Sequence, residues 1–317
     1  MGNAVSSTVD DVNATYWNPA GLINIERDEI SLMHSNYFAN IANFNYISYA
    51  KKIDSESAMG FSLIRFGVDD IMDTTQLIDN QGNIDYNRIE LFSAADYAFI
   101  FSYAKRNKLL NLNFGVNAKI IRRIIGDFAN SWGFGFDLGI QHENKNGWKF
   151  GLMARDITTT YNSWSFDEDR LNDIQNALEG ENQEIPEKNE ISIPKIQLGV
   201  SKEIYLSSDY SMLAAIDLFM LFEQTNDIIS TSFASINPSL GLEFAYSELV
   251  YLRLGLGNFQ NELQFDSTTE LSFQPNFGIG FNLQDIEVNY AFTDIGNQSA
   301  ALYSNIFSLK FNLNLLR

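Results

Sequence analysis

The stretch Trp132-Gly133-Phe134-Gly135-Phe136-Asp137-Leu138-Gly139-Ile140-Gln141 decides the fold class. Large apolar side chains occupy every second position, and a glycine or a polar residue stands at each position between them. Because successive side chains of a strand point to opposite faces, this period of two predicts a strand with one apolar and one polar face. The same alternation recurs from about residue 28 to the end of the chain.

Alternating segments of this kind predict an all-β protein. Many of them exceed the five or six residues typical of strands in soluble proteins, and their number is even, as in bacterial outer-membrane barrels. We therefore favour a transmembrane antiparallel β-barrel of 14 strands over a soluble β-sandwich or a soluble barrel. The 14 segments lie near residues 28–38, 42–51, 57–66, 95–105, 109–122, 130–143, 147–157, 195–203, 210–222, 234–246, 249–258, 271–283, 285–293 and 302–315.

The links between the segments alternate in length. Links after even-numbered segments are short, and those after odd-numbered segments are mostly long, the longest being residues 67–94 and 158–194. One odd link, near residues 39–41, is short and breaks the pattern. Outer-membrane barrels combine short periplasmic turns with long extracellular loops. We therefore expect a multi-pass barrel in the outer membrane of a Gram-negative bacterium, with both termini in the periplasm.

Composition argues against several classes of function. The 317 residues include no cysteine and only two histidines, which leaves little for a thiol or histidine metal site. Acidic residues outnumber basic ones by 40 to 21, and the net charge of -19 argues against nucleic-acid binding. No apolar run reaches the length that a membrane helix needs. Because no nucleophile–base–orienter set is present, we predict a protein that is not an enzyme and has no cofactor or metal.

Residues 1–27 form the first of two predicted units, and the barrel, residues 28–317, forms the second. The first unit is polar and irregular and contains the cluster Tyr16-Trp17-Asn18-Pro19. Pro19 restrains Asn18 to an extended conformation. We predict that this segment plugs the lumen, with Tyr16 and Trp17 at its periplasmic mouth; a packed turn without a gating role is the alternative. No signal peptide is visible, so we expect a processed or trimmed chain.

The long link at residues 158–194 is rich in carboxylates, which could bind Ca²⁺. A solvated acidic loop is the favoured interpretation because EF-hand spacing is absent. A short helix there would place three apolar residues on one side, either as a docking face or as packing against the barrel. The candidate contact residues for a partner or cargo are Asp167, Glu168, Asp169, Leu171, Ile174 and Leu178.

Charged residues of both signs occur on the predicted strands, and we expect them to pair inside the lumen. His34 and His142 lie in predicted strands and are interpreted as packing or lumen-lining residues. Pro275 is the best candidate for a kink, because proline disrupts a β-ladder. The lumen candidates are Arg65, Lys119, Asp217, Glu243, Arg253, Glu287 and Lys310.

Seven segments carry a resemblance to a known family. They are Met1-Gly2-Asn3-Ala4, Asp10-Asp11-Val12-Asn13-Ala14-Thr15-Tyr16-Trp17-Asn18-Pro19-Ala20-Gly21-Leu22, Phe92-Ser93-Ala94-Ala95-Asp96-Tyr97-Ala98, Gly135-Phe136-Asp137-Leu138-Gly139, Gly151-Leu152-Met153-Ala154-Arg155-Asp156, Tyr290-Ala291-Phe292-Thr293-Asp294-Ile295-Gly296 and Phe307-Ser308-Leu309. They resemble the PorV/PorQ family, outer-membrane barrels of the type IX secretion system in Bacteroidetes-type bacteria. The family is related in architecture to the FadL fatty-acid transporters, and the match is most similar to a second PorV-like paralogue.

The resemblance implies a FadL-like barrel with its N-terminal segment folded into the lumen. It also implies a non-enzymatic role in type IX protein secretion. The implied partners are the type IX translocon barrel, attachment-complex proteins, secreted cargo with a type IX C-terminal domain, and outer-membrane lipid or lipopolysaccharide. The alternative is a FadL-like transporter of hydrophobic small molecules; a diffusive porin and an enzyme are more distant alternatives.

Overall fold

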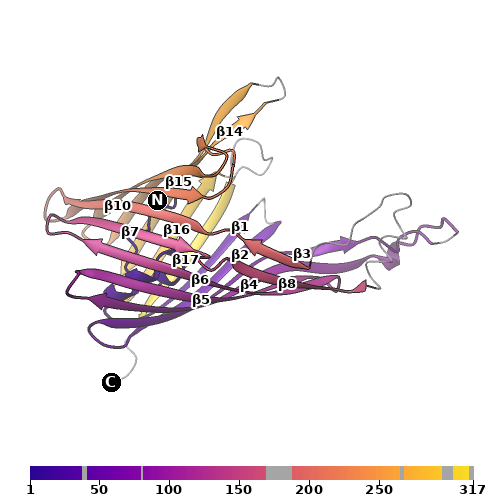
Figure 1. Ribbon diagram of the computed structural model, residues 1–317, viewed down its shortest axis with the longest axis horizontal. Coiled ribbons are helices and arrows are strands. Elements are labelled where there is room, and N and C mark those ends of the chain that lie inside the picture. Colours follow the sequence, from indigo (N-terminus) through magenta and orange to yellow (C-terminus); the bar gives the residue numbers. More distant parts are fainter. Residues whose placement is uncertain (38–40, 80, 169–187, 265–267, 295–302, 314–317) are drawn as a thin grey trace.

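The computed structural model describes residues 1–37, 41–79, 81–168, 188–264, 268–294 and 303–313. Most of them belong to one antiparallel sheet (Figure 1). The strands are β1 (Asp28–Tyr37), β2 (Ala42–Lys52), β3 (Ser57–Asp73), β4 (Glu90–Asn107), β5 (Leu112–Ile125), β6 (Ala129–Glu143), β7 (Trp148–Arg155), β8 (Thr160–Phe166), β9 (Asn189–Ser192), β10 (Lys195–Tyr205), β11 (Tyr210–Leu221), β12 (Ile229–Ser230), β13 (Ser235–Tyr246), β14 (Val250–Leu263), β15 (Thr269–Leu283), β16 (Ile286–Asp294) and β17 (Tyr303–Leu313). The helical elements are α1 (Ala14–Trp17) and the 3-10 turns η1 (Pro19–Asn24) and η2 (Tyr86–Arg88).

The sheet closes on itself. The first strand, β1, pairs with both β2 and the last strand β17, and β7 pairs with β10. Closure pairs every one of the long strands on both sides, which a barrel in lipid requires. The short strands β9 and β12 each pair on one side only. The prediction of an all-β, antiparallel barrel of 14 strands is confirmed; these are β1–β7, β10, β11 and β13–β17. The short strands β8, β9 and β12 are additions that the sequence pattern did not reveal.

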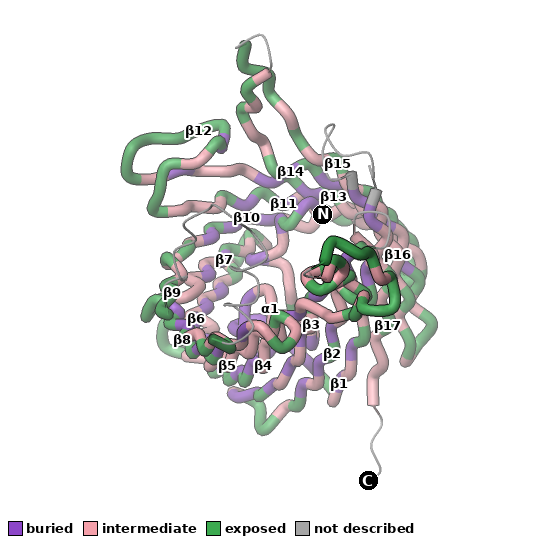
Figure 2. The backbone as a smooth tube through the Cα atoms, turned by 90° about the vertical axis from the view of Figure 1, so that its right-hand side faces the viewer, coloured by how far each residue is buried: buried purple, intermediate pink, exposed green. Residues whose placement is uncertain are grey.

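The two faces of the wall differ in chemistry, as the alternation predicts. Outward side chains are large, apolar and exposed, for example Phe101 at 52% and Phe134 at 56%. Inward side chains are polar and buried, among them Asn117, Asp137 and Asp217. Viewed end-on, the strands form a ring with α1 inside it (Figure 2). Such a continuous apolar outer belt is what a lipid-facing wall needs.

The short turns gather at one end, together with the start of β1 and the end of β17, where Asp28 pairs with Leu313. Between β13 and β14 the two central residues, Ser247 and Glu248, both have positive φ. This conformation is that of a type I′ hairpin turn, whose twist matches the strands that it joins. At the opposite end the link between β5 and β6 is also short, which makes it a second exception to the predicted alternation of lengths.

The predicted loop at residues 67–94 is wrong in its bounds. The long strand β3 continues to Asp73, and β4 already begins at Glu90. These extensions form a hairpin that projects beyond the barrel (Figure 1). A projecting hairpin outside lipid needs no apolar face, so its sequence loses the period of two by which the strands were found. The other predicted loop, at residues 158–194, contains β8 and β9, and residues 169–187 lie outside the described part of the chain.

Candidate functional site: a cavity beside the N-terminal segment

The N-terminal segment, residues 1–25, packs against the inner face of the wall. Its 3-10 turn η1 contacts β3, β4, β5 and β6. The preceding residues reach the opposite side of the ring, where the backbone N–H of Ser6 donates to Asp217 Oδ2 at 2.9 Å. Gln197 Nε2 donates to the carbonyl of Asn3 at 3.2 Å. The segment therefore crosses the interior of the ring, and its predicted role as a plug stays a prediction.

Glycines on the inner face make room for this segment. A Cβ at Gly139 would overlap the Asn18 side chain, and one at Gly115 would overlap the backbone of Ala20. The inward glycines also form cross-strand pairs in register: Gly115 with Gly139, Gly151 with Gly199, and Gly241 with Gly255. We call these paired inward glycines the glycine track. Each pair leaves out two side chains at a point where another backbone approaches, so the glycines are the sequence signal that the N-terminal segment packs against the inner wall.

Asn18 is the central hydrogen-bonding residue of the segment and is fully buried. Its side-chain amide donates to the carbonyl of Ser6 at 2.8 Å and lies 3.3 Å from the carbonyls of Ile140 and Leu152. Its Oδ1 accepts from the backbone N–H of Ala20 at 3.2 Å, which caps η1. The proline at 19 begins η1, where a missing N–H costs least. Asn18 therefore ties two parts of the segment to the wall.

An apolar cluster packs the N-terminal segment against the wall. Val12, Leu22, Ile23 and Ile25 are all nearly inaccessible to solvent. They pack against small inward residues of the wall: Ala50, Ala58 and Ala104. Burial of such side chains stabilises the docked segment by roughly 1.5–3 kcal/mol each. This part of the segment is thus a small hydrophobic core inside an otherwise polar ring.

A cavity of about 530 Å³ lies between α1 and the wall. Tyr16 and Trp17 form one side and contact each other edge to face, with ring centroids 4.9 Å apart. Tyr46 forms part of the opposite side, and its OH lies 2.9 Å from Thr15 Oγ1. We call this space the aromatic cavity; it is lined by Asn3, Asn13, Tyr16, Trp17, Ser31, Met33, Tyr37, Phe44, Tyr46, Arg155, Phe219, Ile306 and Ser308.

Arg155 is the charged residue in this lining. Its Nη2 donates to the carbonyl of Trp17 at 3.3 Å, and its guanidinium lies 5.0 Å from the centre of the Tyr16 ring. Both contacts fix the orientation of α1, since a cation over an aromatic face is attracted by the ring quadrupole. Arg155, Met33, Phe44 and Phe219 are site residues that the sequence pattern alone does not identify. The sequence does contain a signal for three of them: Met33, Phe44 and Phe219 are apolar or aromatic residues at positions where the alternation otherwise has inward polar residues.

The wall is irregular next to Arg155. Residues 156–159 separate β7 from β8, and both Asp156 and Thr159 have positive φ. Lys119 Nζ lies 2.5 Å from Asp156 Oδ1 and 2.6 Å from Asp137 Oδ1, which holds this bulge against the inner face. The ladder does not open, because the N–H of Ile157 still donates to Phe136. At Pro275, the predicted kink, β15 stays paired with β14, but the register shifts immediately beyond it, between Gly257 and Gln260. The pairing of β15 with β16 begins only at Asn276.

A second, polar cavity of about 490 Å³ lies on the other side of α1 and shares Asn13 and Trp17 with the aromatic cavity. Its charges form a chain of ion pairs. Lys310 Nζ lies 2.9 Å from Asp11 Oδ2 and 2.7 Å from Glu287 Oε2. Arg253 pairs with Glu243 and lies 3.7 Å from Glu287. The two cavities therefore meet where α1 stands.

The pKa values of two acidic groups of the segment are shifted from their ordinary values, in opposite directions. Burial and the neighbouring Asp11 charge raise the pKa of Asp10 to about 6, although its carboxyl borders the polar cavity. Burial alone would raise the pKa of Asp11 too, but the Lys310 ammonium outweighs it and lowers the pKa. Asp11 is therefore a charged anchor, whereas Asp10 gains a proton in mildly acidic solution.

Most of the charged lumen candidates do pair with an opposite charge on the inner face, as predicted: Lys119, Glu243, Arg253, Glu287 and Lys310. Asp217 is also inward, but its carboxylate accepts hydrogen bonds from the backbone N–H of Ser6 and from the Gln197 amide instead. Arg65 is a correction. It pairs in register with Asn45 and Tyr97, and therefore points outward with them. His34 is also outward and exposed. Its strand parity places it beside Leu32 rather than Met33, which shows that a charged or polar residue alone does not identify the inner face.

The predicted contact residues of the long link are only partly described. Asp167 and Glu168 are exposed at the end of β8. Asp169, Leu171, Ile174 and Leu178 lie outside the described residues. Within the described part of the chain no group of His, Asp or Glu side chains could hold a metal ion, and no helix there is long and apolar enough to cross a membrane.

Comparison with solved structures decides the architecture. The chain is similar to the CymD monoaromatic hydrocarbon channel, with a TM-score of 0.59 and 10% identity over 97% of this chain and 94% of that chain. It is similar to the Pseudomonas putida toluene transporter TodX, with a TM-score of 0.59 and 12% identity over 99% and 97%. The fold is that of the FadL-like barrels. A Pseudomonas aeruginosa FadL homologue agrees, with a TM-score of 0.52 and 11% identity over 98% and 96%.

No family model matches the chain, and neither does any curated protein. The FadL-like architecture that the sequence predicted is thus confirmed, whereas the narrower resemblance to the PorV/PorQ family stays a prediction. At such low identity the solved structures show the fold alone. They are channels and transporters rather than enzymes, in line with the expectation of a non-enzymatic protein.

Proposed function

We propose that this protein is an outer-membrane channel for small hydrophobic molecules. The observation that carries the proposal is the aromatic cavity, which is large enough for a small ring compound or part of an acyl chain and is walled by α1 and by inward aromatic residues. The fold supports it, because the similar solved structures are a monoaromatic hydrocarbon channel, a toluene transporter and a FadL homologue. The exposed apolar belt supports a position in lipid.

The proposed orientation follows from the turns. The short links and the strand ends near Asp28 and Leu313 lie at one end, and the projecting β3–β4 and β14–β15 hairpins lie at the other (Figure 1). In outer-membrane barrels the short turns are periplasmic. A substrate would enter between the projecting hairpins and reach the aromatic cavity. Residues 1–25 would act as the plug, with Tyr16 and Trp17 facing the substrate rather than the periplasmic mouth.

A cavity-filling pair of variants tests this proposal. Met33 points inward into the aromatic cavity, and Leu32 points outward on the same strand. In Met33→Trp the indole occupies the cavity, so binding of toluene should fall at least tenfold. The matched control Leu32→Trp adds the same side chain to the lipid-facing belt and should bind like the parent. Equal binding by all three proteins would contradict the proposal.

The type IX role remains a second proposal that rests on the PorV/PorQ resemblance. Its partners would be the translocon barrel, the attachment complex and secreted cargo, held through the long acidic link. Affinity isolation from native outer membranes tests it. Co-isolation of a large translocon barrel or of cargo, abolished by deleting residues 165–190, would support the secretion role. A barrel isolated without these proteins but with bound hydrophobic molecules would favour the channel.

A further inference from the structure

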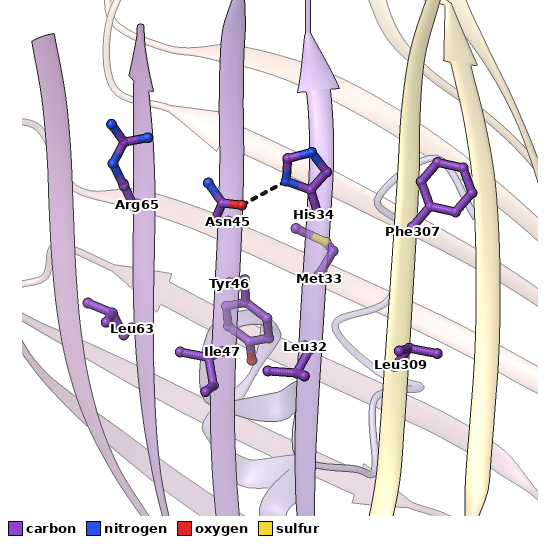
Figure 3. Close-up of a pocket in the computed structure, with 10 residues that line it drawn as sticks. All are labelled: Leu32, Met33, His34, Asn45, Tyr46, Ile47, Leu63, Arg65, Phe307 and Leu309. Carbon is purple, nitrogen blue, oxygen red and sulfur yellow. Dashed lines mark hydrogen bonds between the residues drawn. The ribbon is translucent and has the colours of Figure 1, made fainter. Parts of the chain in front are cut away.

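The outer wall carries a groove in which polar and apolar side chains are sorted into two rows. The groove has a volume of about 400 Å³ and crosses β17, β1, β2 and β3 (Figure 3). The lower row is apolar, and the upper row is polar except for one ring (Figure 3). In register, the lower row is Leu309, Leu32, Ile47 and Leu63, and the upper row is Phe307, His34, Asn45 and Arg65.

The upper row continues beyond the groove. Arg65 pairs in register with Tyr97, which pairs with Arg122, which pairs with Trp132. Residues in register share a face of the sheet, and Trp132 is half exposed on the outside. A belt of aromatic residues interleaved with two guanidinium groups thus runs across β3–β6 at one level. We call the whole line, from His34 to Trp132, the basic row.

The basic row is held in place by contacts within the outer face. His34 Nδ1 lies 2.7 Å from Asn45 Oδ1, and Arg65 Nε donates to the Tyr97 hydroxyl at 3.3 Å. The Arg122 guanidinium lies 4.8 Å from the centre of the Trp132 ring. These contacts restrict the two arginines to the surface of the wall. The row is therefore an ordered feature of the barrel rather than a set of free side chains.

The depth of the basic row in the membrane follows from the free energy of placing a charged side chain in lipid. An arginine on the lipid face costs about 2–4 kcal/mol at the bilayer midplane but only about 0–1 kcal/mol near an interface. On β5 the outward residues that follow Arg122 toward the short turns carry no charge over roughly 33 Å of strand at the usual rise per residue, enough for a tilted strand to cross the apolar band. They are Ile120, Ala118, Val116, Phe114 and Leu112. The row therefore marks the margin of the membrane on the side of the long hairpins.

The charge of the basic row is only partly cancelled by neighbouring carboxylates. Arg65 forms an ion pair with Asp69, at 2.6 Å. The Nη1 of Arg122 instead donates to Asn130 Oδ1 at 2.7 Å and lies 3.4 Å from the carbonyl of Ser131, and both acceptors are neutral. The row thus presents a net positive charge on a chain whose formal charge is -19. Guanidinium groups on a planar surface suit phosphate, which they can bind through two parallel hydrogen bonds.

We infer that this face binds a phosphorylated glycolipid of the lipid A type from the outer leaflet. Its phosphate would lie on the basic row between Arg65 and Arg122, and an acyl chain would lie in the groove along Leu32, Ile47 and Leu63. The sorting of the two rows matches the head and tail of such a lipid. The inference rests on the orientation given under the proposed function, because the row must face the outer leaflet.

Native mass spectrometry of the detergent-purified barrel tests this inference, with lipid A, phosphatidylglycerol and phosphatidylethanolamine each added in turn. The parent protein should retain lipid A in preference to both phospholipids. The double variant Arg65→Gln/Arg122→Gln should lose about thirtyfold in lipid A affinity, since each surface cation contributes about 1 kcal/mol toward an anionic lipid. Arg65→Lys/Arg122→Lys should regain part of it. Lys51→Gln, outward on the same wall at the opposite membrane margin, should bind like the parent.

Three results would overturn the inference. The first is unchanged lipid A affinity in the Gln double variant, and the second is an equal loss in Lys51→Gln. The third is equal retention of phosphatidylglycerol and lipid A, which would place an ordinary phospholipid on the row. Heat-dependent gel mobility shows that each variant is folded. Toluene binding in the same variants should stay at the parent level, so failure here is distinguishable from failure of the channel proposal.

Discussion

The Lys310 ammonium lies 2.9 Å from the Asp11 carboxylate, so the last strand of the barrel holds the N-terminal segment directly. The glycine track and the Asn18 hydrogen bonds hold the segment to β5, β6 and β7. The pair Lys310–Asp11 holds it from the other side of the ring. This arrangement fixes α1 between the two cavities.

Replacing Lys310 by Met should loosen the segment. The change leaves Asp11 and Glu287 without their shared cation, and we expect a loss of about 2 kcal/mol of docking free energy, below the 3–5 kcal/mol of a fully buried pair. Both side chains of the pair are about a fifth exposed, at 18% and 21%. Hydrogen exchange of the amides of residues 9–15 measures the effect. In the double variant Lys310→Met/Asp11→Asn, part of the protection should return; additive losses would contradict a direct interaction.

Gly115→Ala should destabilise the docked segment, because the new methyl group would overlap Ala20. Overpacking of this kind costs about 1–3 kcal/mol. Gly278→Ala is the matched control on another strand, since a Cβ there meets its nearest atom at an ordinary 3.5 Å. Limited proteolysis near residues 18–24 measures the release of the segment. Equal cleavage of the two variants would contradict the packing described here.

Asn18→Ala should weaken docking of the segment more than the loss of one small side chain suggests. The change removes the amide that reaches Ser6, Ile140 and Leu152 and the cap on Ala20. Carbonyls left without a donor in a buried site cost about 1–3 kcal/mol. Hydrogen exchange at Ala20 and Gly21 should rise by at least tenfold. Protection unchanged from the parent would show that Asn18 is not an anchor.

Docking of the segment should depend on pH through Asp10. Its pKa is raised to about 6 from 3.8, so the docked state retains a proton that the undocked state has released. Docking therefore weakens as the pH rises from about 4 to 6 and is constant above that range. The pH dependence from Asp11 has the opposite direction. Because its pKa is lowered, its contribution to docking is lost only in stronger acid. Amide hydrogen-exchange protection of the segment, corrected for intrinsic exchange rates, should fall over this pH range. In Asp10→Asn the protection should no longer depend on pH over this range.

The strands could be predicted from sequence because lipid outside and polar groups inside impose a period of two on every spanning segment. The segment from Trp132 to Gln141 illustrates this, and each of the 14 predicted segments coincides with a barrel strand. The projecting hairpin ends were missed because no lipid imposes the period there. For Arg65, charge alone predicts a position inside the lumen, whereas its strand parity with Leu63 and Phe61 places it outside.

The aromatic cavity could be predicted only in part. Tyr16, Trp17, Asn18 and Pro19 were recognisable as an unusual cluster, and the structure brings them to the inner wall. Their partners come from strands far apart in sequence, such as Arg155 and Phe219, and no local pattern joins such positions. The cross-strand glycine pairs were visible as single glycines, but their alignment depends on register, which the sequence alone does not supply.

The central claim is that small hydrophobic molecules pass through the aromatic cavity. The most direct test is the uptake rate of labelled toluene in cells whose outer membrane contains this barrel as its only hydrocarbon channel. We predict uptake well above that of cells lacking the barrel, a fall of at least tenfold toward that background in Met33→Trp, and no change in Leu32→Trp. Uptake at the background level with the folded parent barrel, or equal uptake by Met33→Trp and the parent, would contradict the claim.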